Sequence, residues 1–145
     1  MKNNKPLLVV TGVISIVLVA SVLYAAGTNS HLEKAVQTGK ELFVHGTFGG
    51  NGNTCETCHT GGGMVQGKMP KGMIIPSLVN AAAIYPRFNP RVHRVITLED
   101  QIRNCIIGAL HGRPPAYGSF HMNALVSYIT SLSQGTPIDM GGKPH

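Results

Sequence analysis

The sequence has no tryptophan, and phenylalanine and tyrosine together make up only 6% of its 145 residues. So few aromatic side chains argue against a large, self-sufficient core in the single domain that this length suits. Charged residues are also sparse, at 12%, and they form no dense Lys/Arg stripe interleaved with aromatics, which argues against nucleic-acid binding. We therefore expect something other than side chains to fill part of the centre of the domain.

Cysteine is scarce as well, and the three cysteines that are present cannot all pair with one another in disulfides. At least one thiol must therefore have another role. Hydrophobic residues make up 43% of the chain, which excludes a disordered or collagen-like protein. The 18 glycines and 9 prolines nevertheless predict many loops.

One long apolar stretch, residues 7–26, contains no charged residue. About twenty apolar residues suffice for a helix to cross a bilayer. Lys2 and Lys5 precede the stretch, which predicts a cytoplasmic N-terminus and an exported remainder. A cleaved signal peptide would share this orientation, but the stretch is long for one and its small-residue cleavage site is poorly formed. We favour a retained membrane anchor over residues 1–27, followed by a domain over residues 28–145 on the periplasmic side of the cytoplasmic membrane.

The exported domain is moderately basic. Two of the twelve Lys and Arg residues precede it, so the chain's net charge of +6 leaves +4 for the domain. A surplus of this size suits acidic protein partners or small anionic substrates, because a positive field speeds their encounter.

Hydrophobic periodicity predicts several helices separated by loops rich in glycine and proline. No run of alternating residues typical of a strand is evident, so we expect a mainly α domain. Gly39 lies within the first helix, where it either costs about 1 kcal/mol against alanine or marks a close contact. The predicted helices are His31–Val44, Pro76–Tyr85, Leu98–Leu110 and Phe120–Leu132.

Two of these helices carry clear patterns. Thr97 and Ser119 are suitable N-caps for the third and fourth helices. The third helix has four residues at a 4-3-4 spacing, which places them on one face: Leu98, Ile102, Cys105 and Ala109. The fourth has a row that we expect to be buried: Met122, Leu125, Val126, Ile129 and Leu132.

Residues 55–59 read Cys-Glu-Thr-Cys-His, which is the CxxCH pattern of covalent c-type haem attachment. Two thiols three positions apart, Cys55 and Cys58, can each add to one vinyl group of the same porphyrin. The next residue, His59, can then reach the iron through a ring nitrogen. One covalently attached haem c would also supply the apolar bulk that the side chains lack.

Three other interpretations of this motif are weaker. A thioredoxin-like CxxC belongs to a strand–helix context, whereas glycine-rich loops flank this one. A structural zinc site needs four ligands, and the sequence has no second CxxC, CxxH or HxxxH pair. A simple disulfide fits the spacing but leaves His59 and the small core unexplained.

The residues themselves leave the second axial ligand of the iron open. Methionine is the ordinary choice in electron-carrying cytochromes, whereas a thiolate stabilises the ferric state. Met122 has packing as its simplest explanation, whereas packing and ligation explain Cys105 equally well, since buried cysteine is common. The methionines that follow the anchor are Met64, Met69, Met73, Met122 and Met140.

Nearly the whole exported domain resembles the haem domain of thiosulfate dehydrogenases and the related SoxA cytochromes of sulfur oxidation. The resemblance rests on Gly50-Asn51-Gly52, Thr54-Cys55, Cys58-His59, Tyr85-Pro86-Arg87-Phe88, Arg94-Val95, Leu98-Glu99-Asp100, Ile102, Cys105, Gly112, Ser119, Met122, Ala124, Val126, Tyr128, Leu132-Ser133 and Gly135. It implies a small, class I-like cytochrome c fold with long Gly/Pro loops. It also implies that His59 and Cys105 are the axial ligands, with Met122 as the alternative distal ligand.

The resemblance further implies a substrate pocket for a thiosulfate-type anion, and here the chain departs from the family. The family's arginine fourteen residues before the ligand cysteine is present as Arg91. Its arginine four residues before that cysteine and its serine four residues after are replaced by Gln101 and Ala109. Arg103 lies two positions before the cysteine, about 200° around the helix from the missing arginine's position. The catalytic residues therefore stay unassigned, with Arg91 as a candidate substrate contact.

Two functions follow from these observations. The favoured one is a membrane-anchored monohaem cytochrome that passes electrons, in a respiratory or sulfur-oxidation chain, to another cytochrome or a membrane complex. The alternative is a tetrathionate-forming thiosulfate dehydrogenase or its haem subunit. That reaction moves two electrons, whereas one haem stores one, so a second acceptor would be needed.

Overall fold

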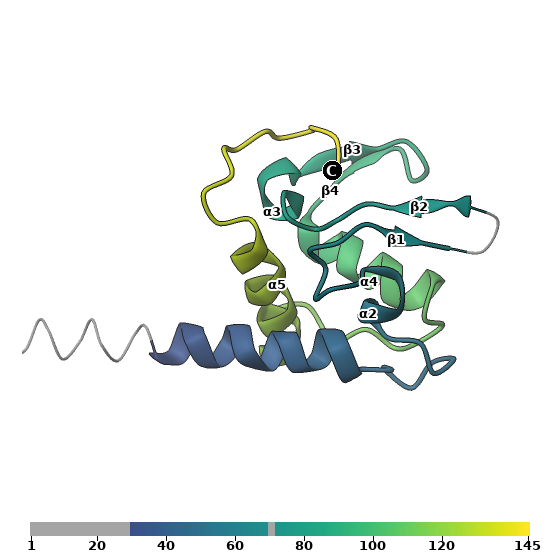
Figure 1. The fold of residues 1–145 in the computed structure, drawn as a ribbon, viewed down its shortest axis with the longest axis vertical. Coiled ribbons are helices and arrows are strands. Elements are labelled where there is room, and N and C mark those ends of the chain that lie inside the picture. The colour runs from purple at the N-terminus through teal and green to yellow at the C-terminus, as the bar shows by residue number, and fades with distance from the viewer. Residues whose placement is uncertain (1–29, 70–71) are drawn as a thin grey trace, which may run out of the picture. The chain divides into compact units, whose positions relative to one another are not determined.

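The computed structural model describes residues 30–69 and 72–145 (Figure 1). The chain forms two compact units, Met1–Lys34 and Ala35–His145, and the second contains the elements labelled in Figure 1. The predicted membrane anchor, residues 7–26, lies outside the described residues. Within the described part of the chain, no helix combines the length and the apolar character that crossing a bilayer requires.

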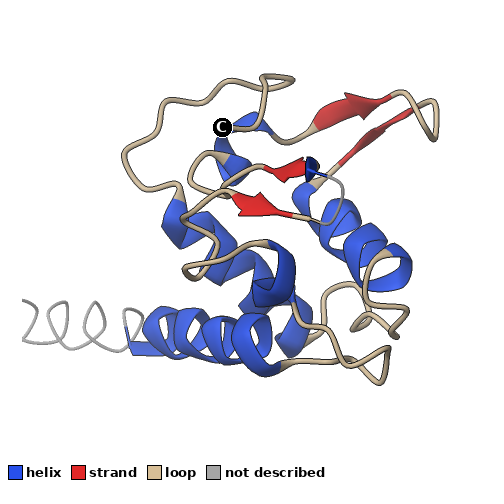
Figure 2. Ribbon diagram, turned by 45° about the vertical axis from the view of Figure 1, so that its right-hand side comes forward, coloured by secondary structure: helices blue, strands red, loops and turns tan. Residues whose placement is uncertain are grey.

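The second unit consists of helices linked by loops and two small hairpins (Figure 2). A helix covers residues 30–45, where the sequence predicts one. The labelled elements that follow are α2 (Cys55–Cys58), β1 (Gly67–Lys68), β2 (Ile74–Ile75), α3 (Ala81–Ile84), β3 (Arg87–Asn89), β4 (Arg94–Ile96), α4 (Leu98–Gly108) and α5 (Phe120–Leu132).

The sequence shows no run typical of a strand, but the structure contains two short hairpins beside its helices. β1 pairs antiparallel with β2, and β3 pairs antiparallel with β4, where Phe88 lies opposite Val95. Each strand has only two or three residues, which is too short to show an alternating pattern in the sequence. The helix predicted from Pro76 is also shorter than expected, because α3 begins only at Ala81.

The helix over residues 30–45 packs closely on α5. Its Phe43 is 1% exposed and meets Tyr128 edge-on, with ring centroids 5.3 Å apart. A Cβ added at Gly39 would collide with the backbone carbonyl of Ala124. Gly39 therefore marks a close contact between two helix backbones, which is one of the two interpretations that its position allowed.

The helices α4 and α5 begin at their predicted caps. The hydroxyl of Thr97 accepts a hydrogen bond from the backbone N–H of Asp100, and the Asp100 carboxylate accepts one from the backbone N–H of Thr97. The hydroxyl of Ser119 accepts from the backbone N–H of Met122. These bonds satisfy N–H groups that have no partner within the helix. The residues buried along α5 are Met122, Ala124, Leu125, Tyr128 and Ile129.

The C-terminal segment returns across α3. The backbone N–H of Asp139 donates to the carbonyl of Ala83, and the side chain of Asn80 donates to the carbonyl of Lys143. The carbonyl of His145 accepts from the backbone N–H of Ser77. These contacts hold residues that are distant in sequence beside the segment that precedes α3, which forms part of the site described below.

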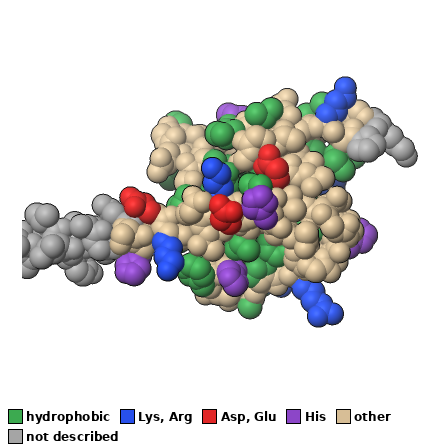
Figure 3. All heavy atoms as spheres, turned by 60° about the horizontal axis from the view of Figure 1, so that its bottom comes forward, with side chains coloured by type: hydrophobic (Ala, Val, Ile, Leu, Met, Phe, Trp, Pro, Cys, Tyr) green, Lys and Arg blue, Asp and Glu red, His purple; other side chains and the backbone are tan. Residues whose placement is uncertain are grey.

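Lys and Arg do not gather into a stripe on the face of the molecule seen in Figure 3, where basic and acidic side chains are interspersed. Each ion pair found among the described residues includes at least one exposed side chain. Arg94 Nη2 lies 3.7 Å from Asp100 Oδ1, for example, with the arginine side chain 58% exposed. Such pairs contribute little to stability. We therefore attribute the stability of the fold to side-chain packing and to the helix caps.

Candidate functional site

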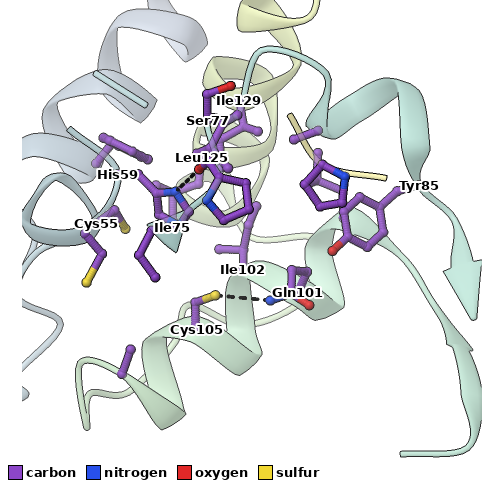
Figure 4. A pocket seen from close by; sticks show the side chains of 18 of the residues that line it. Cys55, His59, Ile75, Ser77, Tyr85, Gln101, Ile102, Cys105, Leu125 and Ile129 are labelled. Atoms are coloured by element: carbon purple, nitrogen blue, oxygen red, sulfur yellow. Dashed lines mark hydrogen bonds between the residues drawn. The ribbon is translucent and has the colours of Figure 1, made fainter. Parts of the chain in front are cut away.

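A cavity of about 400 Å³ lies within the unit formed by residues 35–145 (Figure 4). Its walls come from α2 with the residue that follows it, from the segment before α3, and from one face each of α4 and α5. Most of the side chains that line it are apolar. The four residues predicted to share a face of α4 all line this cavity: Leu98, Ile102, Cys105 and Ala109.

The wall formed by the CxxCH motif is held by local hydrogen bonds. Thr54 and Thr57 form a reciprocal capping box at the start of α2, and the backbone N–H of Thr54 donates to Thr57 Oγ1 at 3.0 Å. Asn51 ties this loop to the end of α4, because its backbone N–H donates to the carbonyl of Leu110 at 2.8 Å. Its side-chain amide donates to the carbonyl of Ala109 at 3.2 Å. The loop is thereby fixed against the opposite wall of the cavity.

All three cysteines of the chain line the cavity, and none of them is in a disulfide. Burial, together with the nearby Cys105 and Cys58, raises the pKa of the Cys55 thiol to about 12 against an opposing backbone hydrogen bond. Burial also raises the pKa of Cys105. In the bare polypeptide these thiols are therefore protonated, as expected of groups enclosed by apolar surface.

His59 is oriented by its neighbour across the cavity wall. Its Nδ1 lies 3.1 Å from the carbonyl oxygen of Pro76, to which it donates as Nδ1–H. Burial lowers the pKa of His59, an effect that the bond to Pro76 and the nearby Glu56 partly oppose. The imidazole is then neutral near pH 7, with Nε2 free to bind a metal. Histidines that bind metals are commonly held by a backbone carbonyl in this way.

Cys105 lies on α4, across the cavity from the motif (Figure 4). Its Sγ is 3.2 Å from Nε2 of Gln101, one helical turn earlier, and the amide donates to the sulfur. Burial raises the pKa of Cys105, the hydrogen bond from Gln101 lowers it, and the nearby Cys58 raises it slightly more. The structure thus brings His59 and Cys105, the two predicted axial ligands, to the same cavity.

The methionines divide into three groups. Met122 is 0% exposed in the hydrophobic core and does not line the cavity. Met69 and Met73 do line it, and Met69 Sδ lies 3.6 Å from Cys58 Sγ. Met64 and Met140 are exposed, at 60% and 66%. Packing therefore accounts for Met122, whereas Met69 lies beside one of the motif cysteines.

The basic residues considered for anion binding lie outside the cavity lining. Arg91 is exposed in the turn between β3 and β4. Arg103 points elsewhere, because its Nη1 donates to the carbonyl of Pro115 and its guanidinium lies 4.2 Å from the ring centroid of Tyr117. Gln101 and Ala109, which stand where the resemblance implies an arginine and a serine, do line the cavity.

Sequence reasoning missed two contributors to the site. The carbonyl of Pro76 orients His59, although the two residues are seventeen positions apart in the sequence. No local sequence pattern indicates such a contact. The hydrogen bond from Gln101 to Cys105 could have been found from the sequence, because residues four positions apart on a helix are neighbours. Gln101 stood out in the sequence only as the replacement for an arginine.

A sequence model of the SoxA/TsdA cytochrome c domain matches residues 38–138. The chain belongs to this family. A thiosulfate dehydrogenase of Psychrobacter arcticus is 33% identical over 88 residues, which are 61% of this chain and 25% of that protein. One of Thiomonas intermedia is 30% identical over 111 residues, 73% of this chain and 33% of the relative.

A SoxA protein and a solved structure extend the comparison. The SoxA subunit of an L-cysteine S-thiosulfotransferase from Pseudaminobacter salicylatoxidans is 28% identical over 106 residues, covering 73% of this chain and 32% of that subunit. The thiosulfate dehydrogenase TsdBA of Marichromatium purpuratum superposes with a TM-score of 0.59 at 26% identity, over 76% of this chain and 24% of the other. The chain thus spans a quarter to a third of the length of these relatives.

A c-type cytochrome domain carries haem c, and the cavity of this SoxA/TsdA domain fits such a group. One wall presents two cysteines and a histidine whose Nδ1 is already engaged, so Nε2 is the free nitrogen. The other wall presents a thiol, and apolar side chains line most of the remainder. The small side-chain core inferred from the sequence is consistent with a large apolar group at this place.

Proposed function

We propose that this chain is a monohaem c-type cytochrome that carries single electrons on the periplasmic side of a bacterial membrane, in a chain that oxidises sulfur compounds. Cys55 and Cys58 would hold the haem through thioether bonds, and His59 and Cys105 would bind its iron. The observation that carries the proposal is that all four side chains, from two separate segments, line one apolar cavity. Haem c supplies a one-electron couple at that position.

The polypeptide contributes orientation and exclusion of water. The Pro76 carbonyl holds the His59 ring, and the bonds of Asn51 to the end of α4 hold the motif loop against the facing wall. The apolar lining keeps water from the site and lowers the local dielectric, which is one of the levers that set a haem potential. These features suit repeated reduction and oxidation without rearrangement of the fold.

An electron carrier needs a docking partner, and we propose another cytochrome or a membrane complex. The surplus of positive charge in the exported domain favours an acidic surface on that partner. A retained helix over residues 7–26 would keep the domain close to a membrane-bound donor or acceptor. The uncharged run of twenty residues after two lysines supports this anchor.

The anchor has a direct test. We expect the full chain to sediment with membranes and to resist extraction by high salt or alkaline carbonate, while detergent releases it. A haem protein in the periplasmic fraction whose mature N-terminus follows residue 26 would overturn the anchor in favour of a cleaved signal peptide.

Thiosulfate oxidation is the second candidate, because the relatives matched over most of the domain are thiosulfate dehydrogenases. The site favours the carrier. Of the family's pocket groups, the arginine and serine on the helix are absent, and Arg91 lies in an exposed turn outside the cavity lining. A two-electron reaction would also need a second acceptor beside one haem.

Mixing oxidised full-length protein with thiosulfate separates the two candidates. We expect the haem to stay oxidised with thiosulfate alone and to become reduced when a reduced cytochrome is added. Prompt reduction by thiosulfate, with tetrathionate formed at catalytic rates once a chemical electron acceptor is supplied in excess, would overturn the carrier in favour of the enzyme. The absorption spectrum reports the redox state of the haem, and a chemical assay of the same mixture measures tetrathionate.

A further inference from the structure

Gln101 is the residue of this site whose role the family resemblance does not supply. We propose that Gln101 is a positioning residue that donates a hydrogen bond to the sulfur of Cys105 and thereby raises the reduction potential of the bound haem. The inference rests on the proposed function, since it requires Cys105 to be an iron ligand. It concerns this chain in particular, because Gln101 stands where the resemblance implies an arginine.

The geometry places the donor on the sulfur. Gln101 and Cys105 are four residues apart on α4, where side chains on the same face meet. The distance from Nε2 to Sγ is 3.2 Å (Figure 4), which is short for a bond to sulfur. Both side chains line the cavity together with Ile102, so the contact is made at an apolar wall. Low polarity strengthens such a bond.

The chemistry of a ligating cysteine fixes the direction of the bond. A thiolate bound to iron has no proton and can only accept, so the N–H end of the Gln101 amide faces it. A hydrogen bond to a charged acceptor is stronger than one between neutral groups. It withdraws electron density from sulfur, which then donates less to the iron. The ferric state is stabilised less, and the potential rises.

A purely structural role for Gln101 predicts something different. If the side chain only fills space on α4, an apolar residue of similar size would preserve the spectrum and the potential. If it acts through the hydrogen bond, the effect follows the donor and the charge of the replacement rather than its volume. The two roles can therefore be separated by substitutions that change the donor in graded steps.

Three substitutions form such a series. Gln101→Leu removes the donor. Gln101→Glu keeps the shape but supplies at pH 8 a carboxylate that cannot donate and that repels the thiolate. Gln101→Arg keeps a hydrogen-bond donor and adds a positive charge. We expect the midpoint potentials to fall in the order Gln101→Arg, wild type, Gln101→Leu, Gln101→Glu, because each step places less positive potential at the sulfur.

The experiment measures two properties of the full-length haem protein in detergent: the midpoint potential by spectroelectrochemical titration, and the sulfur-to-iron charge-transfer band of the ferric form. We expect the band to move to longer wavelength in Gln101→Leu, because the sulfur electrons rise in energy when the bond is lost. Gln37→Leu is the matched control, since Gln37 bonds instead to exposed Glu41 on the helix over residues 30–45. It should leave both properties at the wild-type values.

Equal potentials and equal bands in wild type and Gln101→Leu would overturn the inference, as would an order of potentials that ignores the charge of the replacement. The proposed function is tested separately by covalent haem in the denatured wild-type protein. If haem is attached but the ferric protein has no thiolate band, the ligand assignment and this inference both fail while the attachment by Cys55 and Cys58 stands.

Discussion

The cavity wall that carries Cys55, Cys58 and His59 comes from five consecutive residues, whereas the facing wall comes from one side of α4. The first wall is organised by a short motif and its own capping bonds. The second depends on helical periodicity and on where the helix is placed by the rest of the chain. We infer that the motif wall determines whether the cofactor is held, and that the α4 wall determines how the iron behaves once it is held.

Removing the motif thiols should have the largest effect. In the double variant Cys55→Ser with Cys58→Ser, neither thioether can form, so we expect no haem to remain with the denatured polypeptide. The measurement is a haemochrome spectrum of the protein pellet after extraction with acid acetone, supported by the intact mass. Cys105→Ser is the control and should retain covalent haem. Haem lost equally from both variants would contradict the division between the two walls.

Removing the thiol from the facing wall should change the iron and leave the attachment intact. We expect Cys105→Ala to keep its covalent haem but to lose the low-spin thiolate spectrum, because the distal ligand is gone. Absorption and electron paramagnetic resonance of the ferric protein report this change. An unchanged spectrum would refute Cys105 as ligand. In that case Met69→Ala, at the cavity, and Met122→Ala, in the core, would identify a methionine that takes its place.

The two walls also differ in how far the sequence predicts them. The motif wall could be identified residue by residue, since Cys55, Cys58 and His59 are contiguous and their chemistry depends on spacing. The bounds of α4 and α5 followed from Thr97, Ser119 and a clear period of apolar residues. Signals that lie within a few residues of one another are therefore sufficient for these parts.

What the sequence did not predict depends on distant contacts. The Pro76 carbonyl reaches His59 because the segment before α3 is held by the C-terminal residues, which lie more than sixty positions away. The strands β1 to β4 are too short for a period to appear. Cys105 had packing as an equally good explanation, since periodicity places a side chain on a face but does not say what lies opposite. Folding of the whole chain supplies that information.

The contact between the motif loop and the end of α4 should be sensitive to one added methyl group. A Cβ added at Gly50 would collide with the carbonyl of Leu110, the same oxygen that accepts from the backbone of Asn51. We expect Gly50→Ala to lower the free energy of unfolding of the haem protein by about 1–3 kcal/mol, as overpacking commonly does. Denaturant titration followed by the haem spectrum measures it.

Gly108→Ala provides the matched control, because a Cβ at Gly108 meets nothing within 4 Å and the residue ends α4. Alanine there should be neutral or stabilise by up to about 1 kcal/mol, since it favours the helix. If both variants were equally stable, the close approach at Gly50 would not be what joins the motif loop to α4.

The smallest effect concerns the start of α4 and its dependence on pH. The hydrogen bond from Tyr117, together with the backbone N–H of Thr97 and the nearby Arg94, lowers the pKa of Asp100 despite some desolvation. An acid whose pKa is lower in the folded state stabilises that state above its unfolded pKa, near 4, and loses this contribution as the pH falls through the folded value. Asp100→Asn should therefore be less stable than wild type at pH 7, by about 0.5–1 kcal/mol, because the Tyr117 side chain that bonds to Asp100 is itself exposed and water weakens the interaction.

That difference should shrink as the pH falls below 4, because wild-type Asp100 then becomes neutral too. Tyr117→Phe removes the main cause of the lowered pKa and should show the same convergence with wild type. The measurement is the free energy of unfolding from denaturant titrations between pH 7 and pH 3. A difference in the free energy of unfolding that stays constant over this range would mean that Asp100 stabilises α4 through the geometry of its capping bonds rather than through its charge. The position of the α4 wall would then not depend on pH in acid.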